Sequence, residues 1–125
     1  MRKLFFSVAF LLFATSTGFA GYKWFTDNQY GEADLTVGKQ RFESYCISCH
    51  GDKGHGNGVA ANALNIKPDN IYAELLNPFG TKVELIDSVL EGDNGQGGVM
   101  PPFKAILSEK EINDIFEYIR SLNSY

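Results

Sequence analysis

The pentapeptide at residues 46–50 constrains this 125-residue chain more than any other stretch. It reads Cys-Ile-Ser-Cys-His, so two thiols stand three positions apart and a histidine directly follows the second. On one helical turn, thiols at this spacing can reach the two vinyl groups on one edge of a porphyrin and form thioether bonds. The histidine is then carried under the ring, where its imidazole can bind the iron. The pattern predicts covalent attachment of one haem c through Cys46 and Cys49, with His50 as an axial iron ligand.

Two other roles for the cysteine pair fit the sequence less well. Redox dithiols of the C-x-x-C type begin a helix that follows a strand, and no strand-rich segment precedes Cys46. A structural zinc ion needs four ligands, but the chain has only two cysteines and two histidines, and His50 and His55 fall in the same short loop. Four ligands drawn from residues 46–55 would be very cramped. We expect His55 to be exposed to solvent and not to act as a ligand.

Length and charge narrow the class of protein. With 125 residues and 44% hydrophobic content, the chain is at most one domain, and its core is small enough that a buried haem would enlarge it considerably. The net charge is −4, and without Arg2 and Lys3 the remaining nine basic and fifteen acidic side chains give about −6. An acidic surface argues against a nucleic-acid partner and against charge-driven binding to anionic lipid.

Residues 1–20 have the pattern of a secretory signal peptide. A basic start is followed by an apolar run and then by small residues, with cleavage expected after Ala20. The alternative is an uncleaved membrane anchor over residues 4–22, which are uncharged and would span about 28 Å as a helix. Aromatic residues typical of a membrane interface would lie at its end, namely Tyr22, Trp24 and Phe25. Either outcome places the remaining chain on the outer side of the membrane.

From Asp34 onward the sequence predicts a series of short helices. Asp34 is an N-cap candidate for a helix that ends at the haem motif, whereas residues 21–33 lack a sustained period and indicate a linker or an irregular lead-in. Gly38 inside the first helix costs about 1 kcal/mol relative to alanine, so we expect the terminal helix to approach closely there. Further helical segments are expected at 60–64, 69–76, 81–92 and 108–122, the last two opening with capping-box signatures.

Residues 92–107 form a long loop rich in glycine and proline, and such loops in compact domains are usually functional. The loop contains Met100, the only methionine beyond Met1, and two prolines after it stiffen the backbone. Methionine often fills gaps in a core. With an attached haem that has one open axial position, however, ligation is the favoured role. We therefore expect Met100 to bind the iron opposite His50.

These motifs, in this order, resemble class I c-type cytochromes of bacteria. The resemblance covers residues 34–123 and rests on Gly38-x-x-x-Phe42, Cys46-x-x-Cys49-His50-Gly51, Met100-Pro101-Pro102-Phe103 and the segment from Tyr118 to Leu122. It implies an all-α fold, a small cytochrome c fold of about four to five helices around one covalently attached haem, with the first and last helices crossing. It also implies that Phe42 and Tyr118 lie near the crossing, and that Pro68 offers its carbonyl to the ring N–H of His50.

An iron with a protein ligand on each face has no open site for a substrate, so its expected work is to gain and lose one electron. The main hypothesis is a cytochrome c domain over residues 34–125 that carries electrons between respiratory or other redox proteins in the bacterial periplasm. One alternative is a membrane-anchored haem subunit of a larger oxidoreductase complex. A less favoured one is a haem enzyme or gas sensor with an open iron site. Donor and acceptor oxidoreductases would dock weakly at the exposed haem edge, where four lysines could lie: Lys53, Lys67, Lys82 and Lys104.

Overall fold

The computed structural model describes residues 17–92 and 97–124, and these residues form helices, turns and loops with no strand among them. The helices are α2 (Leu35–Tyr45), α3 (Ile47–His50), the 3-10 helix η1 (Val59–Ala63), α4 (Ile71–Leu76), α5 (Lys82–Glu91) and α6 (Glu109–Leu122). Residues 17–28 form a further helix before them. The predicted all-α fold class is confirmed.

Helices α2 and α6 cross in close contact at Gly38. A Cβ atom added there would overlap the carbonyl oxygen of Asp114 and would lie 3.0 Å from the Cβ atom of Tyr118. The rings of Phe42 and Tyr118 meet at the same crossing, with centroids 6.0 Å apart. The N–H of Asp34 also donates to the Asp114 carboxylate (3.0 Å), which ties the start of α2 to α6. The predicted crossing, its contact at Gly38 and the aromatic pair are confirmed.

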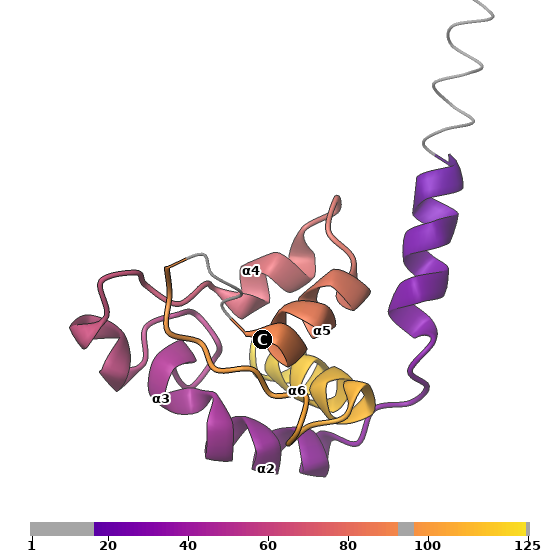
Figure 1. Cartoon of the computed structure of the whole chain (residues 1–125). Coiled ribbons are helices and arrows are strands. Elements are labelled where there is room, and N and C mark those ends of the chain that lie inside the picture. Colours follow the sequence, from indigo (N-terminus) through magenta and orange to yellow (C-terminus); the bar gives the residue numbers. More distant parts are fainter. Residues whose placement is uncertain (1–16, 93–96, 125) are drawn as a thin grey trace, which may run out of the picture.

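The hydrophobic core lies around α6, which packs against α2, α4 and α5. Figure 1 shows α6 with α2 on one side and α5 on the other. The apolar side chains of α6 recur at helical spacing and are joined by residues from the other helices and from the loop before α6. The buried cluster is Phe42, Leu75, Ile86, Phe103, Leu107, Ile112, Ile115, Phe116 and Ile119. Burial of each such side chain contributes about 1.5–3 kcal/mol to the stability of the fold. Helix α6 is therefore the central element against which the other helices pack.

The helix ends follow the local signals of the sequence. Capping boxes are present at Thr81 and Ser108, where each hydroxyl accepts from the backbone three residues on and the glutamate there reaches back. Gly92, with φ of 72°, ends α5. Helix α4 begins one residue later than expected, because the side chain of Asn70 and not that of Asp69 accepts the capping hydrogen bond.

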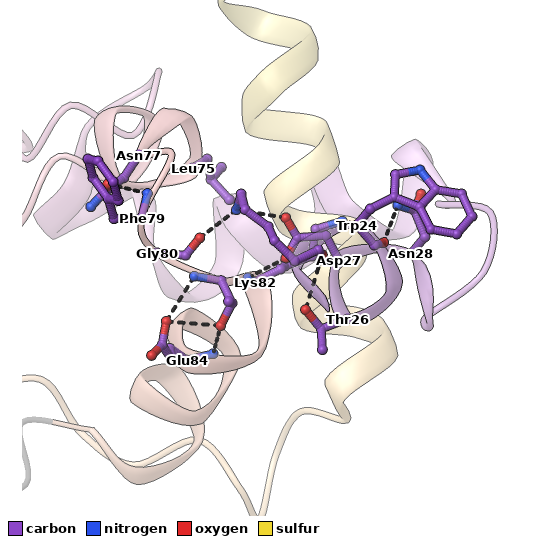
Figure 2. Close-up of polar contacts among 12 residues, drawn as sticks. Trp24, Thr26, Asp27, Asn28, Leu75, Asn77, Phe79, Gly80, Lys82 and Glu84 are labelled. Carbon is purple, nitrogen blue, oxygen red and sulfur yellow. Dashed lines mark hydrogen bonds and ion pairs between the residues drawn. The ribbon is translucent and has the colours of Figure 1, made fainter. Parts of the chain in front are cut away.

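Residues 21–33 were expected to be irregular, but residues 17–28 are helical. Polar contacts hold this helix to the domain: the carboxylate of Asp27 accepts from the backbone N–H of Lys82 (2.6 Å), and the ammonium group of Lys23 donates to the carbonyl of Gly80 (Figure 2). Since the attachment is polar, the segment has no apolar period that could reveal a helix. The predicted signal peptide lies outside the described residues up to residue 16, and within the described ranges no helix is long and apolar enough to cross a membrane.

The capping box of α6 should make stability depend on acid pH. The N–H and hydroxyl of Ser108 donate to Glu111, which also pairs with Arg41, and these contacts lower the pKa of Glu111 below 4.5. The stabilisation is therefore present above pH 4.5 and is lost as the pH falls through the lowered pKa of the native state. Glu111→Gln should cost a few tenths to about 1 kcal/mol at neutral pH, and the difference from wild type should shrink in acid. Denaturant titrations at several pH values measure this, and a difference from wild type that stays constant down to acid pH would contradict the role of the Glu111 carboxylate.

Candidate haem site

The Cys-x-x-Cys-His motif occupies a single helical turn directly after α2. Cys46 is both the C-cap of α2 and the N-cap of α3, and its N–H donates to the carbonyl of Phe42 (2.9 Å). The N–H groups of Cys49 and His50 both donate to the carbonyl of Cys46, at 3.2 and 2.9 Å. Both thiols are free and partly buried. The turn therefore carries two thiols and an imidazole on one short, hydrogen-bonded segment, as covalent haem attachment requires.

Glycines let the following loop close over the backbone of the motif. The N–H of Gly56 donates to the carbonyl of His50 (2.8 Å), and that of Gly58 donates to the carbonyl of Cys49 (3.0 Å). A Cβ atom at Gly58 would overlap the carbonyl oxygen of Ser48, so the loop can approach this closely only with glycine there. His55, in the same loop, is exposed, as predicted, and its Nε2 lies 2.8 Å from the side-chain oxygen of Asn123.

The imidazole of His50 is oriented by a backbone carbonyl. Its Nδ1 lies 3.1 Å from the carbonyl oxygen of Asp69. With Nδ1–H donating to that oxygen, Nε2 carries the lone pair that a metal ligand needs, which is the usual outer-shell arrangement of a metal-binding histidine. The carbonyl that contacts His50 is that of Asp69 and not that of Pro68, whose oxygen lies beside Gly56 and would overlap a Cβ atom added there. The expected role of Pro68 thus belongs to its neighbour in this structure.

The electrostatics of the motif favour ligation and not thiol redox chemistry. Burial lowers the pKa of His50 from its ordinary value, although the Asp69 carbonyl opposes the shift, and this favours the neutral imidazole that a metal ligand needs. Burial, with a smaller contribution from Cys49, raises the pKa of Cys46 to about 12. Reactive C-x-x-C dithiols have a lowered thiol pKa. Cys46 therefore lacks the lowered pKa on which the dithiol alternative depends.

Met100 lies on a loop that is fixed to the end of α5. The N–H groups of Phe103 and Lys104 donate to the carbonyls of Val89 and Leu90, each at 3.2 Å. The Met100 side chain is half-buried and packs against the same hydrophobic core as Cys46 and Ile47. Two segments far apart in sequence, the motif and the Met100 loop, are thus built onto one core.

Exposed apolar side chains accompany these two segments. Val59 and Ile66 belong to the region of η1, which packs against α3, and Val99 directly precedes Met100. A Cβ atom at Gly97 would lie 3.4 Å from the Cδ1 atom of Ile66, so the two regions are in contact. Exposed apolar side chains on the segments that carry the motif and Met100 are candidates for contact with a bound group or a partner. These residues were not singled out as site residues from the sequence. Apolar side chains in glycine-rich loops were a signal that could have indicated them.

The lysines expected near the haem edge are only partly available. Lys82 is 8% exposed, and its ammonium group contacts Asn113 (2.9 Å) and Glu117 (2.8 Å). Lys104 is exposed but pairs with Glu91 (3.1 Å). Lys53 and Lys67 remain exposed. Lys82 therefore has a structural role, because it joins the start of α5 to α6.

Comparison with known proteins identifies the family. The family model described as cytochrome c oxidase, cbb3-type, subunit III matches residues 33–119. The chain belongs to this cytochrome c family. This cytochrome c domain is 35% identical over 100 residues to the cbb3-type cytochrome c oxidase subunit CcoP of Rhodobacter capsulatus, covering 73% of the chain and 30% of CcoP. It is 34% identical over 92 residues to cytochrome c6 of Chlorolobion braunii, covering 70% of the chain and 90% of that relative.

Family membership decides the coarse function. The chain spans about 30% of the length of the CcoP relatives that it matches and nearly the whole of cytochrome c6. The cytochrome c family implies covalently bound haem c, and its work is electron transfer, so the domain is an electron carrier and not an enzyme in itself. The residues of α3 and its N-cap Cys46 fit that cofactor, since they supply two thiols for thioether bonds and an imidazole for the iron.

Proposed function

We propose that the chain is a one-electron carrier with a single haem c, attached through Cys46 and Cys49 and ligated at its iron by His50 and Met100. The observation that carries the proposal is the orientation of His50: the Asp69 carbonyl fixes Nδ1, and Nε2 is left for a metal on the same turn as the two thiols. When bound, haem supplies the redox-active iron.

The protein's own part in this function is to close and stiffen the site. With a side chain on each face of the iron, no position is left for a substrate. The motif is braced by its backbone bonds to Phe42 and to the glycine loop, and Met100 by the attachment of its loop to α5. Ligands held in this way change little between oxidation states, which keeps the cost of reorganisation small. A thioether ligand and an apolar core both favour the reduced iron.

We propose export to the bacterial periplasm under the direction of residues 1–20, with redox proteins as donor and acceptor. The exposed side chains of Val59, Ile66 and Val99 would contribute apolar contacts to a small docking surface, in keeping with the low interface area of electron-transfer encounters. A second candidate is a haem subunit held in a membrane oxidoreductase complex. The similarity to CcoP and the docked helix at residues 17–28 favour it. Gel filtration of detergent extracts from native membranes separates a free carrier from a complex.

Haem stoichiometry and redox titration test the proposal. The mature protein should carry one haem per chain that survives denaturation and acid extraction, as shown by intact mass and by a pyridine haemochrome assay. Its redox titration should follow a one-electron curve. Cys49→Ala should leave the haem attached through a single thioether bond. Ser48→Ala, at an exposed position between the two cysteines, should leave attachment unchanged. Haem that extracts freely from the wild-type protein would refute the assignment.

A further inference from the structure

The helix at residues 17–28 is polar on the side that faces the domain. Lys23, Thr26 and Asp27 share one face, since positions three and four apart lie together on a helix. Thr26 is 6% exposed, and the ammonium group of Lys23 donates to the carbonyl of Gly80 in the turn before α5. Asp27 accepts from the N–H of Lys82, the first residue of α5 (2.6 Å). This polar face fixes the end of the helix to residues 80–82.

The rest of the helix surface is aromatic and exposed. Tyr22, Trp24 and Phe25 are 59%, 70% and 66% exposed. Tyr22 and Trp24 are two positions apart and therefore lie on nearly opposite sides of the helix, and Figure 2 shows the indole of Trp24 pointing away from the turn that holds Asp27. The aromatic side chains thus cover the broad side of the helix that lies opposite the polar face. A helix in water buries its apolar face and exposes its polar one, and this helix does the reverse.

We propose that Tyr22, Trp24 and Phe25 lie in the headgroup region of a lipid bilayer, and that the contacts of Lys23 and Asp27 hold the haem domain at a fixed orientation to that surface. Tyrosine and tryptophan are enriched at membrane interfaces, where an apolar ring meets a wet polar edge. The sequence leading into the helix is uncharged from residue 4 to residue 22, which suits lipid on that side. The inference deepens the proposed function, since it rests on export of the domain to the outer side of the membrane, and it takes the alternative in which residues 4–22 are not cleaved.

The charges of this region favour a zwitterionic surface. The one cation on the aromatic segment, Lys23, is directed inward, with its ammonium group on Asp27 and Gly80. The exported part of the chain is acidic, so attraction to anionic lipid would not drive the contact. Lipid contact should therefore depend on the aromatic rings and should not increase with anionic lipid content.

The attachment extends into the haem domain. Lys82, whose N–H holds Asp27, also binds Asn113 and Glu117 on α6 through its ammonium group. The helix is thus connected to the central element of the core and not to a flexible loop. Motion of the haem relative to the bilayer is then restricted, whereas a flexible linker would leave it free.

Trp24 is the only tryptophan of the chain and reports its own environment. The full-length haem protein is reconstituted in phosphatidylcholine vesicles, with and without lipid brominated near the headgroup end of the acyl chain. Emission from Trp24 should fall about twofold with the brominated lipid, as expected for a ring at the interface, and acrylamide in the water should quench it weakly. The control is Trp24→Phe, which has no tryptophan, so any response to brominated lipid that it retains would not come from Trp24.

The outcomes separate this inference from the proposed function. If Trp24 emission is equal in brominated and plain vesicles while the haem spectrum is intact, lipid contact is refuted and the proposed electron-carrier function is not affected. Protection of Trp24 from both lipid and acrylamide would overturn it as well, by indicating burial against another protein. Asp27→Ala should keep the lipid response but lower the fluorescence anisotropy of Trp24. Unchanged anisotropy would contradict the fixed orientation.

Discussion

Met100→Ala should open the sixth coordination position of the haem iron. Without the thioether, water would occupy that position, and the oxidised protein should change from low spin to high spin, as measured by electron paramagnetic resonance and by absorption. The potential should fall by on the order of 0.1 V, a modest part of the roughly 0.8 V range that axial ligands set, because the thioether favours reduced iron. The fold should survive, since Met100 is at the edge of the core and its loop is fixed by backbone bonds of Phe103 and Lys104.

Met100→His is the matched variant. A second imidazole would keep the iron six-coordinate and low spin while still lowering the potential. The pair therefore separates loss of a ligand from change of a ligand. If Met100→Ala stayed low spin with an unchanged potential, Met100 would have only a packing role, and another group would have to bind the iron.

Gly38→Ala should destabilise the domain more than any other single methyl group added to α2. The new Cβ atom would meet the carbonyl oxygen of Asp114 and the Cβ atom of Tyr118. The first is a backbone atom and the second is bonded directly to the backbone, so neither can move aside as the tip of a flexible side chain can. Overpacking of this kind costs about 1–3 kcal/mol. In a domain of this size each kcal/mol lowers the melting temperature by roughly 4–8 °C. Thermal denaturation followed by circular dichroism measures the loss.

Gly80→Ala is the control for Gly38→Ala. The nearest atoms to a Cβ atom at Gly80 belong to the flexible side chain of Asn77 and lie 3.6 Å away, an ordinary contact distance. This variant should melt within a few degrees of wild type. Equal melting temperatures for the two variants would mean that α2 and α6 do not cross as closely as the structure shows.

Much of the fold was predictable because its signals are local or rest on strong geometry. The capping boxes at Thr81 and Ser108 each lie within four residues, and their hydrogen bonds form as the pattern predicts. Gly38 was informative since a glycine inside a helix costs stability unless something needs the space. The spacing of Cys46, Cys49 and His50 places them on one turn whatever surrounds it.

The remainder depended on contacts between distant parts of the chain. The helix at residues 17–28 is held by Asp27 on Lys82, a polar contact across 55 positions that leaves no periodic pattern. Burial of Lys82 depends likewise on Asn113 and Glu117 of α6. The choice between the carbonyls of Pro68 and Asp69 was set by the register of a loop, in which a shift of one residue has no signature in composition.

Exposure of the reduced wild-type protein to carbon monoxide tests most directly whether the iron is closed to outside ligands. Carbon monoxide binds ferrous haem only where an axial position is open or its ligand leaves readily. With His50 and Met100 both in place, the absorption spectrum of the reduced protein should not change under the gas, while Met100→Ala should respond at once. Rapid formation of a carbonyl complex by the wild-type protein would contradict the assignment of an electron carrier with two protein ligands.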